Sequence, residues 1–272
     1  MKKDKFKIAS VNTFFDGADV SSIGVTDWVI LHANMFFGNP ATLQKHQEKR
    51  KDLHPLEKVI KEYDPDVVVV NEIVHTPWGS ESQNILHKYG FHDISYGRDP
   101  TGLGDYHRMT AVATRFPATK TNLKVQSFPG GRFCALQADG WVFIGVQGCP
   151  FYDSARLNQI KRVFKQCEKY HGEECNVLVA GDFNTDLVQE NVSPPAITQH
   201  ISDKTFPHSG FPDQLANGSG LLTRWTKNIL GLKNGQRSLD HILVSEPHEV
   251  NGYWTEQTTS DHLALVAEVK LQ

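Results

Sequence analysis

Apolar residues fall into short runs along the chain, and these runs predict a series of β-strands. Residues 6–12 (FKIASVN) alternate apolar with polar positions, which is typical of a strand that buries one face. Residues 66–70 (DVVVV) do not alternate, and a strand this apolar is usually covered on both faces. Further strands are expected at residues 109–114, 123–127, 132–137, 141–146, 176–180, 239–244 and 263–269. The Asp139–Gly140 pair between two of these strands indicates a hairpin turn.

Apolar residues at helical spacing predict three helices. The spacing occurs over residues 53–63, 80–89 and 153–170, and in the last of these Asp153 or Ser154 can cap the first turn. Strands and helices alternate early in the chain, and strands cluster later, with no repeat and no dividing linker. We therefore expect sheets packed together with helices outside, in one α/β domain covering residues 1–272.

In other segments the apolar residues show no clear periodicity. Residues 16–41 are irregular, although residues 28–37 (WVILHANMFF) form an apolar run that either packs on the core or meets a lipid surface. Core packing is the simpler interpretation. Residues 44–51 form a charged run that suits a solvated surface, and residues 186–236 are rich in proline and glycine and are expected to form loops.

The net charge, the apolar runs and the cysteines of the chain exclude several classes of protein. The 272 residues carry a formal net charge of −3, which excludes a strongly basic scaffold that holds nucleic acid by charge alone. No apolar run approaches the roughly 20 residues that a membrane helix needs, and the first residues do not form a signal peptide. The four cysteines form no CxxC pair, so free thiols are expected, although pairing stays open. We expect a monomeric, cytoplasmic protein.

Polar residues repeatedly stand at the ends of the most apolar strands. Strand ends are where a rigid sheet can bring polar groups together in one cleft. Carboxylates gathered in this way tolerate one another when a hard cation such as Mg²⁺ lies between them. Each dipeptide alone is more often an ordinary turn or strand end, so the order of the whole set carries the prediction. The residues are Asn12, Glu72, Asp182, Asn184, Asp240, His241, Asp261 and His262.

Six stretches of the chain carry a resemblance that runs nearly from end to end. They are SVN (10–12), PDVVVVNEI (65–73), TAVATRFP (110–117), GDFNTD (181–186), RSLDHILVS (237–245) and SDHLALVAEV (260–269). With this ordered set the chain resembles the endonuclease/exonuclease/phosphatase superfamily, which has the deoxyribonuclease I-like fold. The resemblance implies a four-layer α/β sandwich of two packed mixed β-sheets flanked by helices, with the site at one rim.

The resemblance also implies a metal site. Glu72 matches the principal Mg²⁺ ligand of the family, with Mn²⁺ as an alternative cation. Asn12 matches the asparagine that helps to place metal and phosphate, and Asp261 matches an acidic residue that can help to bind the metal. Such a cation polarises a phosphoryl oxygen and stabilises developing charge.

The catalytic roles implied by the resemblance fall on the remaining residues. Asp182 matches the aspartate that orients or deprotonates the attacking water, and Asn184 matches the asparagine that contacts the phosphate. His262 matches the histidine at the scissile phosphate, and Asp240 matches its carboxylate partner. The neighbouring His241 is expected on the opposite face of its strand, because successive side chains alternate.

One part of the family pattern is missing. Many members have a second catalytic histidine in an Asn-Thr-His stretch before the long helix, where this chain has Gln147–Cys149. Three interpretations stay open: another residue replaces the histidine, the enzyme works more slowly with His262 alone, or the chain has kept only binding. Losing one such group typically costs about 10²–10⁴-fold in rate. The candidate replacements are Tyr152, His107 and Cys149.

The substrate is the least determined part of the prediction. Members of the family cleave DNA, RNA, sphingomyelin and inositol phosphates. Arg156 on the long helix is a candidate phosphate contact, and Arg224 and Trp225 lie in a basic stretch of the kind that suits a nucleic acid strand. The leading hypothesis is a Mg²⁺-dependent phosphodiesterase, or nuclease, that cleaves nucleic acid. The alternatives are a lipid or small-molecule phosphodiesterase or phosphatase, and a catalytically weakened binding module.

Overall fold

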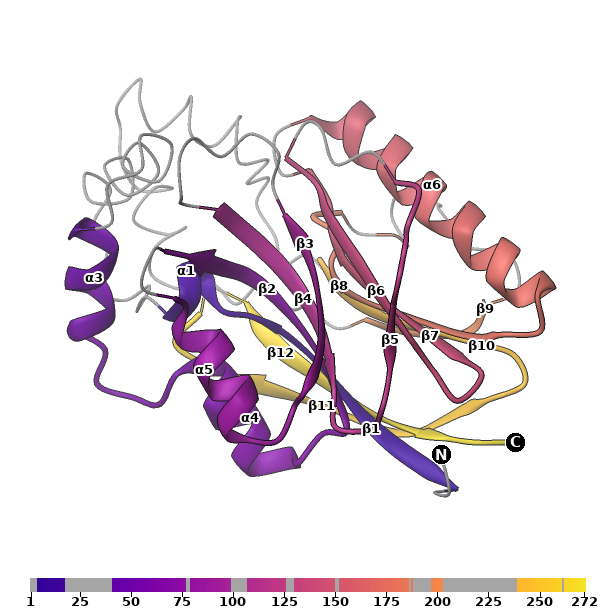
Figure 1. The fold of residues 1–272 in the computed structure, drawn as a ribbon, viewed down its shortest axis with the longest axis horizontal. Coiled ribbons are helices and arrows are strands. Elements are labelled where there is room, and N and C mark those ends of the chain that lie inside the picture. Colours follow the sequence, from indigo (N-terminus) through magenta and orange to yellow (C-terminus); the bar gives the residue numbers. More distant parts are fainter. Residues whose placement is uncertain are drawn as a thin grey trace.

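The apolar runs of the sequence form two six-stranded sheets that pack face to face (Figure 1). The computed structural model describes residues 4–17, 41–76, 79–98, 107–125, 130–149, 152–185, 187, 197–202, 239–260 and 262–272. In spatial order the first sheet contains β11 (Glu249–Gln257), β12 (Leu263–Lys270), β1 (Lys5–Asn12), β2 (Val67–His75), β4 (His107–Thr114) and β3 (Asp93–Arg98). The second contains β5 (Thr119–Thr121), β6 (Arg132–Ala138), β7 (Trp141–Gln147), β8 (Asn176–Asp182), β10 (Asp240–Ser245) and β9 (Ile197–Ser202).

Each sheet is mixed, because each has one parallel pair of strands. In the first sheet β1 runs parallel to β2, and in the second β7 runs parallel to β8. The other paired strands are antiparallel. The carboxyl ends of the four parallel strands therefore bring Asn12, Glu72, Gln147 and Asp182 toward one rim of the sandwich.

The central core lies between the two sheets. Alternate residues of each strand point inward, and the inward set from both sheets is almost fully removed from solvent. The ring of Phe6 from the first sheet meets the ring of Trp141 from the second edge to face, with centroids 5.1 Å apart. Such a pair adds specific geometry to the burial of apolar area. The core thus fixes how the sheets lie against each other.

Helices cover the outer faces of both sheets. In Figure 1, α4 (Pro55–Tyr63) and α5 (Glu81–Lys88) lie over the first sheet, and α6 (Asp153–Gly172) lies over the second. Each outer face has its own buried apolar cluster beneath the helices. Two short helices, α1 (Phe14–Gly17) and α3 (Ala41–Glu48), complete the described set. The four-layer α/β sandwich expected from the sequence is confirmed.

Most of the expected elements are found, and the exceptions have physical reasons. Residues 123–125 are not a strand, which makes that prediction wrong. The adjacent strand is β5, and Leu123 and Val125 pack instead as loop residues against the outer cluster under α6. The N-cap position of α6 is occupied by Tyr152, which makes no side-chain cap, and not by Asp153 or Ser154 as expected.

Some helices and strands of the structure were not predicted from the sequence. β11 is an edge strand whose residues are mostly exposed or half-buried, so its pattern lacks the alternation that marks a half-buried strand. β9 lies inside the stretch expected to be loops, and α3 occupies part of the charged run at residues 44–51. The apolar run at residues 28–37 lies outside the described residues.

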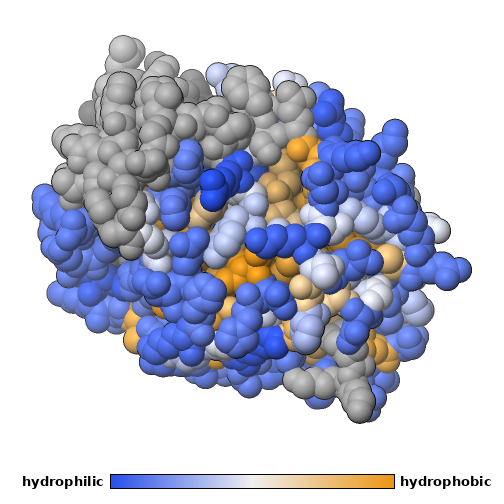
Figure 2. Space-filling view, in the orientation of Figure 1, coloured by the Kyte–Doolittle hydropathy of each residue, from blue (hydrophilic) through white to orange (hydrophobic). Residues whose placement is uncertain are grey.

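The hydrophilic surface and the free cysteines agree with the expectations from the composition of the chain. Hydrophilic residues cover most of the face shown in Figure 2, with an apolar area near the middle of the view. All four cysteines are free thiols, and Cys134, Cys149 and Cys167 are buried. None of the helices within the described ranges has the length and apolar character needed to cross a bilayer.

Candidate active site

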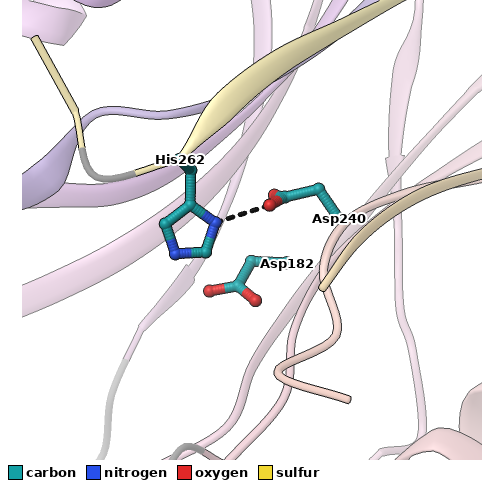
Figure 3. A group of neighbouring side chains, drawn as sticks. All are labelled: Asp182, Asp240 and His262. Atoms are coloured by element: carbon teal, nitrogen blue, oxygen red, sulfur yellow. Dashed lines mark hydrogen bonds and ion pairs between the residues drawn. The ribbon is translucent and has the colours of Figure 1, made fainter. Parts of the chain in front are cut away.

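Three titratable side chains from distant parts of the chain meet at the rim where the parallel strands end. Asp182 is the last residue of β8, and its register partner on the antiparallel strand β10 is Asp240. His262 comes from the first sheet, directly before β12. Figure 3 shows the ring of His262 beside the Asp240 carboxylate, with the Asp182 carboxylate below the ring. The three residues are buried, and the sheets bring them together from distant parts of the sequence.

A short hydrogen bond fixes the orientation of the His262 ring. The distance from Nδ1 of His262 to Oδ2 of Asp240 is 2.5 Å. An ionised carboxylate can only accept, so the ring proton lies on Nδ1. Nε2 is then the ring atom that can exchange a proton with a bound group or donate to it, and the carboxylate favours the charged form of the ring.

Amide groups hold the carboxylate of Asp182. Its Oδ1 accepts from the main-chain N–H of Asn184 at 2.8 Å, and its Oδ2 accepts from the Asn184 and Asn12 side chains at 3.1 and 3.4 Å. Burial is the main cause that raises the pKa of Asp182 to about 7; the nearby carboxylates of Asp240 and Glu72 add to its effect, while His262 and the N–H of Asn184 oppose it. A carboxyl group with a pKa near neutrality can accept a proton from a water molecule at physiological pH.

The same three side chains could be considered as cation ligands. One ligand atom from each of Asp182, Asp240 and His262 lies within 4.8 Å of those of the other two. The 2.5 Å contact argues against that use, because Nδ1 and Oδ2 share a proton and are not both free for a metal. The cluster is better suited to proton transfer and to contact with a substrate.

Glu72 offers a carboxylate oxygen of a different kind. It lies in β2 where the register with β4 shifts between Val70 and Ile73, and its φ is +61°. A non-glycine residue at such a φ is strained, and strain of this kind is concentrated at functional sites. Within the described part of the chain its Oε2 is buried without a hydrogen-bond partner. A buried carboxylate oxygen left in this way fits a divalent cation.

Asn71, which sequence reasoning missed, ties the two sheets together beside this cluster. Its Nδ2 donates to the main-chain oxygen of Val146 at 2.8 Å and to the hydroxyl of Thr110 at 3.1 Å. Its Oδ1 accepts from the main-chain N–H of Asp182 at 3.2 Å. The only available signal in the sequence was a polar residue next to Glu72 at the end of a strongly apolar run.

The stretch where the family histidine was expected is packed tightly. Cys149 is fully buried, its N–H donates to Gln159 of α6 at 3.1 Å, and its carbonyl oxygen accepts from Arg156 at 3.2 Å. Tyr152 is 61% exposed at the start of α6. His107 begins β4 opposite His75. Of the residues in this stretch, Gln147 is the one that contacts Glu72, with 3.3 Å from its Nε2 to Oε1.

The remaining predicted residues are placed as follows. Arg156 is buried and donates to the Cys149 carbonyl, so its role in substrate binding stays a prediction. His241 lies on the far face of β10, as expected, with its ring edge-on to that of Phe183. The two hydrogens of the Asn184 amide serve Asp182 and the Gly148 carbonyl. Three predicted residues lie outside the described residues, namely Asp261, Arg224 and Trp225.

Comparisons with known proteins agree with the family and the fold. A model of the Endonuclease/Exonuclease/phosphatase family matches residues 31–262. An endonuclease/exonuclease/phosphatase from Beutenbergia cavernae DSM 12333 is 14% identical with a TM-score of 0.60, and covers 99% of this chain and 72% of its own. One from Bacteroides vulgatus is 15% identical with a TM-score of 0.60, with 99% and 100% covered.

A third similar structure is that of ANGEL2, described as a 2′,3′-cyclic phosphatase, in complex with adenosine-2′,3′-vanadate. It is 15% identical with a TM-score of 0.57, and covers 98% of this chain and 96% of its own. At such identities the structures show a shared fold. No curated protein matches the sequence.

Proposed function

Because the chain belongs to the endonuclease/exonuclease/phosphatase family, we propose that it is a divalent-metal-dependent phosphoester hydrolase that cleaves nucleic acid as a phosphodiesterase. The observation that carries the proposal is the buried cluster of Asp182, Asp240 and His262 beside the strained Glu72. Asp182 can accept a proton, His262 can donate a hydrogen bond to the substrate, and Glu72 can bind a cation.

The metal part of the proposal rests on the free oxygen of Glu72. Glu72 would hold Mg²⁺ through Oε2, with Asn12 and Asp261 as further candidate ligands and Mn²⁺ as an alternative cation. When bound, such a cation polarises a phosphoryl oxygen and offsets the negative charge of the transition state. The hard oxygen donors of these residues suit Mg²⁺, which keeps several waters and needs only one or two carboxylates.

The protein residues supply the remaining steps. Asp182 orients a water molecule and accepts its proton as the water oxygen attacks phosphorus in line with the leaving oxygen. The new bond to phosphorus forms as the bond to the leaving oxygen breaks, and the leaving oxygen takes up a proton from solvent water to depart as a hydroxyl group. His262, charged and supported by Asp240, donates a hydrogen bond from Nε2 to the phosphoryl group. Asn12 and Asn184 keep the Asp182 carboxylate in place.

Two observations favour a nucleic acid substrate. ANGEL2, which shares the fold, holds an adenosine-2′,3′-vanadate, so the fold can present a phosphoester site to a nucleoside. The basic and aromatic stretch around Arg224 and Trp225 suits a nucleic acid strand. In the charged run at residues 44–51, Arg50 already pairs with Glu81 at 2.5 Å and is not needed to explain substrate binding. A lipid or a small phosphoester is the alternative substrate.

The experiment measures hydrolysis of single- and double-stranded DNA, RNA, phospholipid vesicles and a soluble phosphodiester, each with Mg²⁺, Mn²⁺ or EDTA. We expect turnover of a nucleic acid that needs the metal and is lost in Glu72→Gln and His262→Ala. His248→Ala is the matched control, because this buried histidine packs on Trp141 at the other end of β7. Inactivity on every substrate with either metal would overturn the proposal. Salt-sensitive nucleic acid binding without turnover would instead identify a binding module.

A further inference from the structure

Gln147 ends β7 beside the catalytic cluster and is almost fully buried. In the parallel pairing of β7 with β8 its register partner is Asp182, and in the antiparallel pairing with β6 its partner is Arg132. Its side chain therefore lies between a carboxylate cluster and a cationic group. No role has been given to it so far.

The two ends of the Gln147 amide have distinct partners, and Arg132 determines which end faces which. The distance from Nη1 of Arg132 to Oε1 of Gln147 is 2.5 Å, and the hydroxyl of Thr110 donates to the same oxygen at 3.3 Å. A guanidinium group has only donors, so the amide oxygen must face it. The amide nitrogen is then left facing Glu72, with 3.3 Å from Nε2 to Oε1.

Arg132 makes this orientation rigid. Its side chain is the largest of the fully buried ones, and it starts β6 opposite the last residue of β7. A buried guanidinium is costly when it loses an acceptor, so rotation of the Gln147 amide would remove a favourable contact and bring two donors together. The amide therefore acts as a fixed connection from Arg132 to Glu72.

Because Gln147 bonds to one oxygen of Glu72, the two carboxylate oxygens have different surroundings. Oε1 accepts the hydrogen bond from Gln147, and Oε2 is buried and unpartnered within the described residues. We propose that Gln147, held by Arg132, is a positioning residue that fixes the Glu72 carboxylate with Oε2 directed at the cation. This inference rests on the proposed function, in which Glu72 binds the metal.

The test titrates Mg²⁺ into EDTA-stripped full-length protein and follows the thermal unfolding midpoint. Gln147→Met keeps the size of the side chain and removes the hydrogen bonds with Arg132, Thr110 and Glu72. The Mg²⁺ concentration at half-saturation should rise about 10–100-fold, the usual cost of losing the hydrogen-bond partner of a metal ligand. Hydrolysis should be impaired most at limiting Mg²⁺ and recover as Mg²⁺ is raised, which a purely structural defect would not do.

Two further variants make the result decisive. Gln159→Met is the matched control, because Gln159 is also buried near the site but bonds to the Cys149 N–H, and its Mg²⁺ dependence should equal that of the wild type. Gln147→Asn keeps the amide but is too short to reach both Arg132 and Glu72, so it should also raise the half-saturating Mg²⁺ concentration. It provides the answer if Gln147→Met does not fold.

The outcomes separate this inference from the proposed function. If the wild type shows no Mg²⁺-dependent shift, the metal site of the proposed function fails, and the inference fails with it. If Mg²⁺ raises the unfolding midpoint of the wild type but not that of Glu72→Gln, the metal site is supported. In that case, a wild-type Mg²⁺ dependence in the folded Gln147 variants overturns the inference alone.

Discussion

At the scale of single residues, the bond between His262 and Asp240 decides which ring nitrogen carries the proton. The 2.5 Å contact places that proton on Nδ1 and leaves Nε2 toward the site. Two residues that are 22 positions apart in the sequence thus form one functional unit. The carboxylate has a second effect, since it stabilises the charged ring that would face a phosphoryl group.

Asp240→Asn tests this unit. The variant keeps the shape of the side chain but removes the negative charge that supports the protonated ring. We expect kcat to fall about 10²–10⁴-fold, the usual cost of impairing one acid–base group, while the thermal midpoint stays close to that of the wild type. Steady-state kinetics at saturating Mg²⁺ measure the effect. An unchanged kcat would show that the ring acts without its partner.

His54 gives a second prediction at this scale, and it concerns pH. Its Nδ1 accepts from the Leu56 N–H at 3.2 Å at the start of α4, and its Nε2 lies 3.3 Å from the hydroxyl of Ser82. Burial, with a smaller contribution from the charge of Arg50, lowers its pKa to about 3. Between pH 6.5 and 3 the unfolded chain therefore binds a proton that the folded chain does not.

This difference destabilises the fold as the pH falls through that window. From pH 7 to pH 5 the His54 contribution to the free energy of unfolding should drop by about 2 kcal/mol. His54→Asn can still cap α4 but does not titrate, so its free energy of unfolding should lose correspondingly less over the same interval. Urea denaturation of both proteins at pH 7 and pH 5 measures the difference. Equal losses would contradict the assignment.

At the scale of elements, β3 and β6 approach each other closely although they belong to different sheets. A Cβ atom on Gly97 of β3 would lie 2.4 Å from the main-chain oxygen of Phe133 in β6. Backbone atoms cannot move aside as a flexible side chain can. The absence of a side chain at this position is therefore what allows the two strands to meet.

Gly97→Ala should lower the free energy of unfolding by about 1–3 kcal/mol, the usual cost of overpacking. Gly172→Ala is the control, because a Cβ atom at the end of α6 meets nothing within 4 Å. Alanine there should be neutral or slightly stabilising, since it is the better helix former. Urea denaturation of the two variants tests the contrast, and equal stability would mean that β3 can shift away from β6.

At the scale of the whole molecule, Asn71 joins the two sheets at the functional rim. Its side chain bonds to the main chain of Val146 and of Asp182, which are 75 and 111 residues away in the sequence. Both partners belong to the opposite sheet. The position of Asp182 relative to Glu72 therefore depends on how the sheets are packed.

Asn71→Leu would leave these main-chain groups without their side-chain partner. Each buried polar group that loses its partner costs about 1–3 kcal/mol, so a clear loss in the free energy of unfolding is expected. Activity should fall as well, because Asp182 loses one of its anchors. Asn84→Leu on the exposed face of α5 is the control and should change neither property. A stable, fully active Asn71→Leu protein would show that the sheets need no such link.

Much of the fold and part of the site could be read from local patterns. Local patterns are enough to mark these elements: β1 and α6 show the alternation or helical spacing of apolar residues, and β2 and β7 are continuous apolar runs that are buried on both faces. Exposed edge strands such as β11 are not detected in this way, since they bury little surface on either face. The motif residues Asp182, Asp240 and His262 were predicted to converge, and the structure places them together.

The sequence by itself thus determined the family, the two kinds of layer and several of the residues at the rim. Only the tertiary structure decided how those residues are used. The bulge that turns Glu72 to a positive φ depends on its pairing with β4, and the Arg132–Gln147–Glu72 connection joins both sheets. Such contacts depend on which strands become neighbours. The contact of Gln147 with Glu72 and that of Asn71 with Asp182 span 75 and 111 residues, which no local pattern records.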